Sequence, residues 1–168
     1  VEFQINFVDA AGNQATRSTL TEGDGVRVDL EGPVLSDISI ISNNDNVSWG
    51  REGDNITLSF TSNETIQTPD LTNISIFGLT DLVFTSLNDN DTRWQVTGTV
   101  DEDAVSGAGG SGGSGFADFS ISVTDQAGNT GSSVADATGG ERVALDVEAP
   151  VVNAVNIRSS NENSSLAK

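Results

Sequence analysis

The sequence predicts an all-β fold: a seven-stranded antiparallel sandwich flanked by partial copies of the same unit. Three observations lead to this prediction. Apolar and polar residues alternate with period two along most of the chain, no stretch shows the 3.6-residue period of a helix, and two blocks of sequence recur about 117 residues apart. Seven alternating segments within one such period match the count and spacing of a seven-stranded sandwich.

The seven segments are justified by one rule. Ile56–Phe60, for example, places Ile, Leu and Phe on one side and Thr and Ser on the other, as a strand that covers a core requires. In chain order the expected strands are Ile38–Ile40, Ile56–Phe60, Ile74–Ile76, Leu82–Ser86, Trp94–Val100, Phe119–Val123 and Val143–Val147. Leu82–Ser86 has the weakest pattern, and Trp94 falls on the apolar side of its strand, where we expect a core residue.

The recurring blocks lie at the two ends of the chain. Residues 3–13 and 119–129 are identical at six of eleven positions, with an offset of 116. Residues 29–51 and 146–168 are identical at nine of 23 positions, with an offset of 117. Because both pairs keep the same order and nearly the same offset, they mark an internal repeat.

The repeat sets the expected domain boundaries. Residues 1–33 should be the last two strands of a preceding unit, residues 34–150 a complete unit, and residues 151–168 the first strand of a following unit. Neither end holds enough strands to close a core by itself. We therefore expect the chain to be part of a longer tandem array that continues past Lys168 with the next strand of the unit. The alternative is completion of both ends by adjacent chains.

Residues 106–115, SGAGGSGGSG, are the one low-complexity stretch, and they fall between the fifth and sixth expected strands. Gly and Ser at this density predict a flexible loop that adds nothing to the core. The sequence is compatible with a natural loop insertion and with an engineered linker.

The composition excludes several classes of function. The chain has 25 acidic and 7 basic residues, a net charge of −18, and no Cys, His, Met or Tyr. A disulfide scaffold, a Cys/His metal centre and a His- or Cys-based nucleophile are therefore impossible. The negative charge disfavours nucleic acid as a partner, no apolar run is long enough for membrane insertion, and acidic pairs such as Asp101 and Asp103 are too frequent to indicate an enzyme.

Several short motifs in this order resemble the bacterial-type immunoglobulin-like repeats of large extracellular surface proteins and adhesins. The D-x-A-G-N turn occurs at Asp9–Asn13 and Asp125–Asn129, the D-x-x-x-P junction occurs at Asp29–Pro33 and Asp146–Pro150, and Gly53–Asp54 precedes the strand NITLSF. The resemblance covers nearly the whole chain. It implies an immunoglobulin-like sandwich, an extracellular or cell-surface location, and a role as a stalk, fibre or filament.

The D-x-A-G-N turns have two interpretations. One is turn chemistry alone, in which Asp accepts backbone N–H groups and Gly adopts a positive φ. The other is a Ca²⁺ site between consecutive units, since the end of one unit and three loops of the next should meet at one pole, and Ca²⁺ takes six to eight oxygen ligands. The expected ligands are Asp29, Glu31, Asp89, Asp91, Asp125 and Asn129.

Asp146 and Glu148 are the equivalent pair at the second junction, with partner loops expected beyond Lys168. The turn at Asp9 likewise lacks its upstream partner. For Asp89 and Asp91 alone, a solvated acidic loop is the competing interpretation.

Six Asn-x-Ser/Thr sequences are possible glycosylation sites if the producing organism is eukaryotic. They begin at Asn46, Asn55, Asn63, Asn73, Asn90 and Asn163. An Asn- and Thr-rich surface without glycans is the alternative, although alternation should point Asn55 and Asn73 outward.

The leading functional hypothesis is an extracellular structural module whose partners are neighbouring repeats. The alternative is a module that binds a glycan or a surface receptor, with Trp49 of the first interstrand loop as a stacking platform. Such a module could also be an accessory domain of a secreted enzyme whose catalytic residues lie elsewhere.

Overall fold

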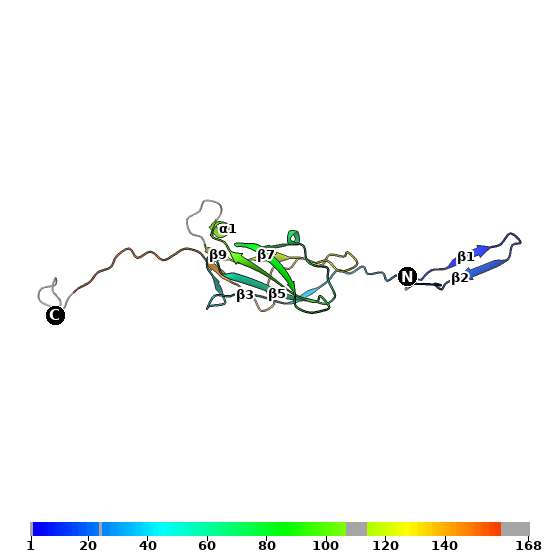
Figure 1. The fold of residues 1–168 in the computed structure, drawn as a ribbon, viewed down its shortest axis with the longest axis horizontal. Helices are drawn as coiled ribbons and strands as arrows, with labels where there is room; N and C mark the ends of the chain where they lie inside the picture. Colours follow the sequence, from blue (N-terminus) through cyan, green and yellow to red (C-terminus); the bar gives the residue numbers. More distant parts are fainter. Residues whose placement is uncertain (1, 24, 107–113, 159–168) are drawn as a thin grey trace.

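The computed structural model describes residues 2–23, 25–106 and 114–158. Figure 1 shows an elongated molecule with a central β body, a separate hairpin at one end and an extended segment at the other. The hairpin consists of β1 (Ile5–Val8) and β2 (Gln14–Arg17), which pair antiparallel. Residues 151–158 leave the opposite end of the body outside any strand.

One face of the body is a four-stranded antiparallel sheet. It contains β3 (Leu35–Ser42), β5 (Asn55–Ser62), β8 (Arg93–Val100) and β7 (Leu79–Ser86), in the order β3-β5-β8-β7. Side chains alternate along β5 between buried positions and more accessible ones, as the period-two pattern predicts.

The other strands form two smaller groups. In the first, β6 (Ile74–Ile76) pairs antiparallel with β10 (Phe119–Ile121). In the second, β11 (Ala144–Asp146) pairs antiparallel with β9 (Ser114–Phe116) and parallel with β4 (Trp49–Gly50).

Both sets of strands share one hydrophobic core. Ile56 and Leu58 of β5 are fully buried in the same cluster as Ile121 of β10 and Leu145 of β11, and Trp94 is 5% exposed. Over the described residues the fold is therefore all-β and sandwich-like, with mainly antiparallel strand pairing and almost no helix. The prediction that Trp94 belongs to the core is confirmed.

Each of the seven strands predicted for the complete unit overlaps an observed one, whereas the strand expected at the start of the following unit is not formed over residues 151–158. The structure also adds elements that alternation could not indicate. Trp49 lies in β4 rather than in a loop, because a two-residue strand is too short to show a period. The Gly/Ser stretch is not a loop throughout, since Ser106 ends α1 (Glu102–Ser106) and Ser114 begins β9. The rest of that expected loop, residues 107–113, lies outside the described residues.

Two short helical elements also interrupt the strand pattern. The 3₁₀ helix η1 (Leu71–Asn73) begins after Asp70, whose side chain accepts a hydrogen bond from the Thr72 N–H. The helix α1 follows Asp101, whose carboxylate accepts a hydrogen bond of 2.8 Å from the Ala104 N–H. Asp101 therefore caps the N-terminus of α1. Among the described residues, no helix is long and apolar enough to cross a membrane.

The strand expected at the end of the first partial unit is absent. The repeat aligns residues 26–30 with residues 143–147, yet residues 26–30 lie outside any strand and β1 pairs with Gln14–Arg17 instead. In the body, β11 is held between β9 and β4. Residues 2–23 and 25–33 contain no counterpart of these two strands, so the pairing that makes β11 a strand is not available to the equivalent segment as a ladder.

Both edge strands of the four-stranded sheet carry an irregularity occupied by Asp. The register shifts between Ser36 and Ser39 in β3 and between Thr80 and Val83 in β7. Asp37 and Asp81 lie at these positions with φ of 49° and 52°. A bulge that holds a charged residue hinders the pairing of an exposed edge with another chain.

Candidate functional site

The two D-x-A-G-N turns have the same geometry. In the turn of the body, Oδ1 of Asp125 accepts hydrogen bonds of 2.8 Å from the N–H groups of Ala127 and Asn129, and Oδ2 accepts one of 2.8 Å from Nδ2 of Asn129. In the hairpin, the Asp9 carboxylate accepts the equivalent three bonds at 2.8–2.9 Å. Gly12 and Gly128 adopt φ of 90° and 96°, which a side chain would disfavour.

The turns differ in what covers them. Asp125 is only 1% exposed, whereas Asp9 is exposed. Two segments cover the body's turn. One is Ile66–Gln67, which is hydrogen-bonded to the main chain of the turn. The other is the junction Asp29–Pro33, hereafter the first linker. Nδ2 of Asn129 donates a hydrogen bond of 3.2 Å to the main-chain oxygen of Asp29, and Pro33 is buried.

The chain immediately after the first linker is fixed to the loop that follows β5. The Val34 N–H donates to Oδ1 of Asn63 at 2.8 Å, and the Asn63 N–H donates to the Val34 oxygen at 3.1 Å. This pair brings the neighbouring Glu64 to the pole where the linker meets the turn.

Three carboxylates meet at this pole. Asp29 of the linker, Glu64 of the loop after β5 and Asp125 of the turn each place a carboxylate oxygen within 4.8 Å of the others. Asp29 is exposed, Glu64 is half-buried and Asp125 is buried. We call these residues the acidic triad.

The electrostatics of the triad are unfavourable without a counter-charge. The pKa of the Glu64 carboxyl is raised above its ordinary value of 4.5, first by burial and then by the negative charges of Asp29, Asp125 and Glu31. Burial also acts to raise the pKa of Asp125, but hydrogen bonds, chiefly from Asn129, outweigh it and hold the pKa below 3.8. Asp125 therefore stays ionised, and the repulsion between the carboxylates raises the pKa of Glu64.

The donor set of the triad is compatible with a hard divalent cation. An ionised carboxylate offers about four lone-pair sites, so Asp125 retains acceptor capacity on Oδ2 after its three hydrogen bonds. Two oxygens bound to one Ca²⁺ at about 2.3–2.6 Å lie no more than about 5 Å apart, and the spacing of the triad falls within that limit. Oxygen ligands at this spacing do not by themselves select one hard cation over another.

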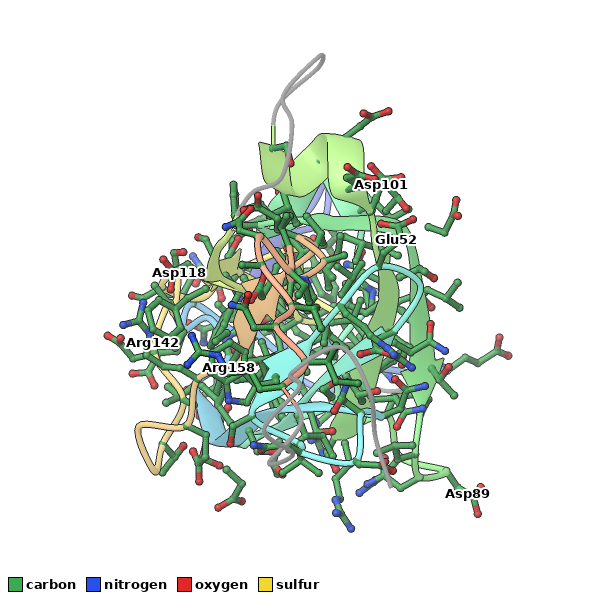
Figure 2. All side chains as sticks on the ribbon, turned by 90° about the vertical axis from the view of Figure 1, so that its left-hand side faces the viewer. Glu52, Asp89, Asp101, Asp118, Arg142 and Arg158 are labelled. Atoms are coloured by element: carbon green, nitrogen blue, oxygen red, sulfur yellow. The ribbon has the colours of Figure 1, made fainter. Side chains whose placement is uncertain are left out.

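The residues predicted from sequence are only partly gathered here. Asp29 and Asp125 belong to the triad, Glu31 lies near enough to act on Glu64, and Asn129 positions Asp125 with its amide. Asp91 lies outside the triad, because its carboxylate accepts a hydrogen bond of 2.6 Å from Ser86 in its own loop. Asp89 also lies outside the triad and points away from the body in Figure 2.

Sequence reasoning missed Glu64. The signal was available, since the loop after the second expected strand lies at the same pole as the D-x-A-G-N turn in a sandwich of this kind. Glu64 sits within the sequence Asn63-Glu64-Thr65. The two acidic residues of its loop, Glu64 and Asp70, lie six positions apart, whereas Asp89 and Asp91 lie two apart. The closer spacing of the second pair favoured the wrong loop.

The second junction, Asp146–Pro150, hereafter the second linker, has the same local geometry as the first. The Glu148 N–H donates to Oδ1 of Asp146 at 3.1 Å, as the Glu31 N–H donates to Oδ1 of Asp29 at 3.2 Å. Asp146 and Glu148 are both exposed.

The remaining sequence-predicted positions lie on the surface. The sequon residues Asn46, Asn55, Asn63, Asn73 and Asn90 are all exposed, as expected for Asn55 and Asn73, and Asn163 lies outside the described residues. Trp49 is 48% exposed on β4, so it is a rim residue with one side accessible.

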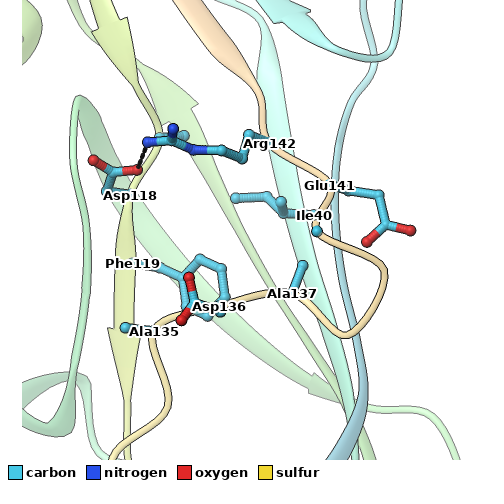
Figure 3. A pocket seen from close by; sticks show the side chains of 10 residues that line it. Ile40, Asp118, Phe119, Ala135, Asp136, Ala137, Glu141 and Arg142 are labelled. Carbon is cyan, nitrogen blue, oxygen red and sulfur yellow. Dashed lines mark hydrogen bonds and ion pairs between the residues drawn. The ribbon is translucent and has the colours of Figure 1, made fainter.

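Figure 3 shows a pocket whose lining includes the charged residues Asp118, Asp136 and Arg142 and the apolar residues Ile40 and Phe119. Arg142 forms an ion pair of 2.6 Å with Asp118, and its guanidinium lies 3.8 Å from the centroid of the Phe116 ring. Arg142 is therefore already engaged by groups of the chain itself.

Comparisons with protein-family models, with curated proteins and with solved structures found no match for this chain.

Proposed function

We propose that the chain is a segment of a tandem array of immunoglobulin-like units that serves as an extracellular stalk, fibre or filament. One observation carries the proposal: apolar residues that are buried in the body are exposed at the equivalent positions of the two ends. Ile121 is 0% exposed and its equivalent Ile5 is 57% exposed, while Ile40 is 2% exposed and its equivalent Ile157 is 97% exposed. We expect these exposed apolar side chains to be buried by further strands of the same unit in the longer polypeptide.

The strand order of the body supports the immunoglobulin-like assignment. In that fold the first, second, fifth and fourth strands form one sheet, which is the order β3-β5-β8-β7. The third and sixth expected strands pair on the other side as β6 and β10. The seventh expected strand departs from this pattern, because β11 pairs with β9 and β4 rather than with β10.

The surface chemistry supports an extracellular structural role. A thiol-free chain with a net charge of −18 has no cysteine to oxidise outside the cell and repels other acidic surfaces. The parent polypeptide tests the array directly. It should continue after Lys168 with residues like Glu52-Gly53-Asp54 and an alternating strand, and a helical or low-complexity continuation would contradict the proposal.

Ca²⁺ bound by the acidic triad is the proposed stiffening element of the junction. The cation would neutralise the charges that raise the pKa of Glu64 and would tie the linker, through Asp29, to Glu64 and Asp125 of the body. A ligand that binds only the native state stabilises it by about 2.7 kcal/mol at one hundred times its Kd. Millimolar Ca²⁺ should therefore raise Tm and narrow the range of end-to-end distances in small-angle scattering.

The variant Glu64→Gln separates this proposal from a general salt effect. In chelator the variant should melt above the wild type at pH 7, because one of the repelling charges is gone. In Ca²⁺ that advantage should disappear, because a ligand is gone as well. Mg²⁺ and equivalent ionic strength from NaCl serve as controls. Equal melting of both proteins with and without Ca²⁺ would refute the cation site and leave the array proposal standing.

The half-exposed Trp49 favours a second candidate function, glycan binding by the rim of the body. An exposed indole beside polar loops can stack on a sugar ring. Binding on a glycan array that is lost in Trp49→Ala, with unchanged Tm, would favour this role over a purely structural one.

A further inference from the structure

The first linker and the body's turn meet at two glycines. A Cβ on Gly32 would lie 2.6 Å from the main-chain oxygen of Thr130, and a Cβ on Gly131 would overlap the main-chain oxygen of Pro33. Both separations are far below ordinary van der Waals contact. The two backbones therefore approach each other more closely than any other residue type would allow.

Space, rather than backbone conformation, requires these glycines. Neither Gly32 nor Gly131 adopts the positive φ that Gly12 and Gly128 show. Alanine would be acceptable at either position if the opposing backbone were absent. The requirement for glycine therefore exists only while the linker is docked on the turn.

The repeated copies of both positions carry alanine. The offset of 117 aligns Gly32 with Ala149 of the second linker, and the offset of 116 aligns Gly131 with Ala15, which follows the hairpin's turn. Local geometry is otherwise conserved between the copies, since both linkers and both turns make the same internal hydrogen bonds. The copies therefore differ in the presence of a Cβ atom at these two positions, and this atom limits how closely a linker and a turn can approach each other.

We propose that Gly32 and Gly131 form a matched pair that selects which linker docks on which turn in the array. A D-x-x-G-P linker docks closely on a turn followed by glycine, whereas the second linker, with Ala149, is excluded from such a surface and requires a wider one. The inference rests on the proposed array function, and it assigns the partner of the Asp125–Gly131 surface as a linker with glycine before proline. Successive junctions of the array therefore differ in tightness.

Digestion by a glutamate-specific endoproteinase tests the pair within this chain. The bonds Glu31–Gly32 and Glu148–Ala149 are both followed by Pro, so the two linkers form matched cleavage sites, and the variant Ala149→Gly makes the two bonds identical. Cleavage requires a locally undocked backbone. In native conditions with chelator, this variant should be cut after Glu31 at least about tenfold more slowly than after Glu148.

Adding a Cβ should release the first linker. Gly131→Ala, which leaves the cleaved sequence untouched, and Gly32→Ala, which lies outside the body, should each raise cleavage at Glu31 by about tenfold or more. Cleavage at Glu141, which lies outside the docking surface, should stay unchanged, and this separates undocking from unfolding of the body. Gly25→Ala is the matched control, because a Cβ there meets nothing within 4 Å.

Rapid cutting at Glu31 in the wild type, or no change in either glycine variant, would overturn the matched pair. Neither result depends on what precedes or follows the chain in its parent. A parent polypeptide without further repeats would instead refute the array proposal and leave the docking result intact.

Discussion

Truncation of one isoleucine in each copy of the same strand gives the sharpest test of the relation between the hairpin and the body. Ile5 and Ile121 are equivalent by the 116-residue offset. Ile121 of β10 is 0% exposed within the core, whereas Ile5 of β1 is 57% exposed. The same substitution, Ile→Ala, is therefore made once in a packed site and once in an unpacked one.

The expected magnitudes follow from burial. Ile121→Ala removes buried carbon atoms and leaves a cavity, for which the cost in the free energy of unfolding is about 2–5 kcal/mol. Ile5→Ala leaves no cavity and removes a side chain that is already more than half exposed, so its cost should be within about 0.5 kcal/mol. In a unit of this size each kcal/mol lowers Tm by about 3–6 °C.

Urea and thermal unfolding followed by Trp fluorescence measure both effects, because Trp94 is buried in the body's core. Ile121→Val, expected to cost about 0.5–1.5 kcal/mol, calibrates the packing response. A loss below about 1 kcal/mol for Ile121→Ala would show that β10 is not packed as described. An equally large loss for Ile5→Ala would show that the hairpin packs on the body, against the array interpretation. In a longer chain that includes the preceding unit, Ile5→Ala should become as costly as Ile121→Ala.

Two further predictions concern titration and modification. In chelator, stability should rise with pH as Asp125 ionises below its ordinary pKa of 3.8, because the native protein holds that proton less tightly than the unfolded chain. Stability should then fall as the pH rises from 4.5 through the raised pKa of Glu64, since the native protein retains that proton to higher pH, and Glu64→Gln should abolish the fall. A denaturant midpoint that rises steadily from about pH 3 to about pH 7 would contradict this. In a eukaryotic secretory host, Asn55 and Asn73 should carry glycans because both are exposed, and an intact mass equal to that of the bare polypeptide would rule this out.

Strand positions in the body were predictable because burial imposes a short-range pattern. Residues two apart on a strand share a face, so Ile56, Leu58 and Phe60 reveal both the strand and its buried side without knowledge of the partners. The D-x-A-G-N turns were predictable for a similar reason. Asp125 bonds to groups at most four residues away, and the sequence therefore holds all the participants.

Contacts between distant segments could not be predicted in this way. The parallel pairing of Trp49–Gly50 with β11 joins residues about a hundred positions apart, and the two-residue strand has no period to detect. The absence of a strand at residues 26–30 also depends on distant segments. The equivalent strand β11 lies between β9 and β4, and the described residues before the body contain no counterpart of those two strands.

The sequence by itself determined the all-β class, the repeat, the positions of most strands, and the turns, since each depends on neighbours along the chain or on the comparison of two copies. Only the tertiary structure decided which carboxylates meet, placing Glu64 beside Asp29 and Asp125 while Asp91 turned to Ser86. The requirement for glycine at positions 32 and 131 is likewise set only by the tertiary structure. Their need for space arises from a backbone about one hundred residues away, and that approach is set by packing rather than by any local propensity.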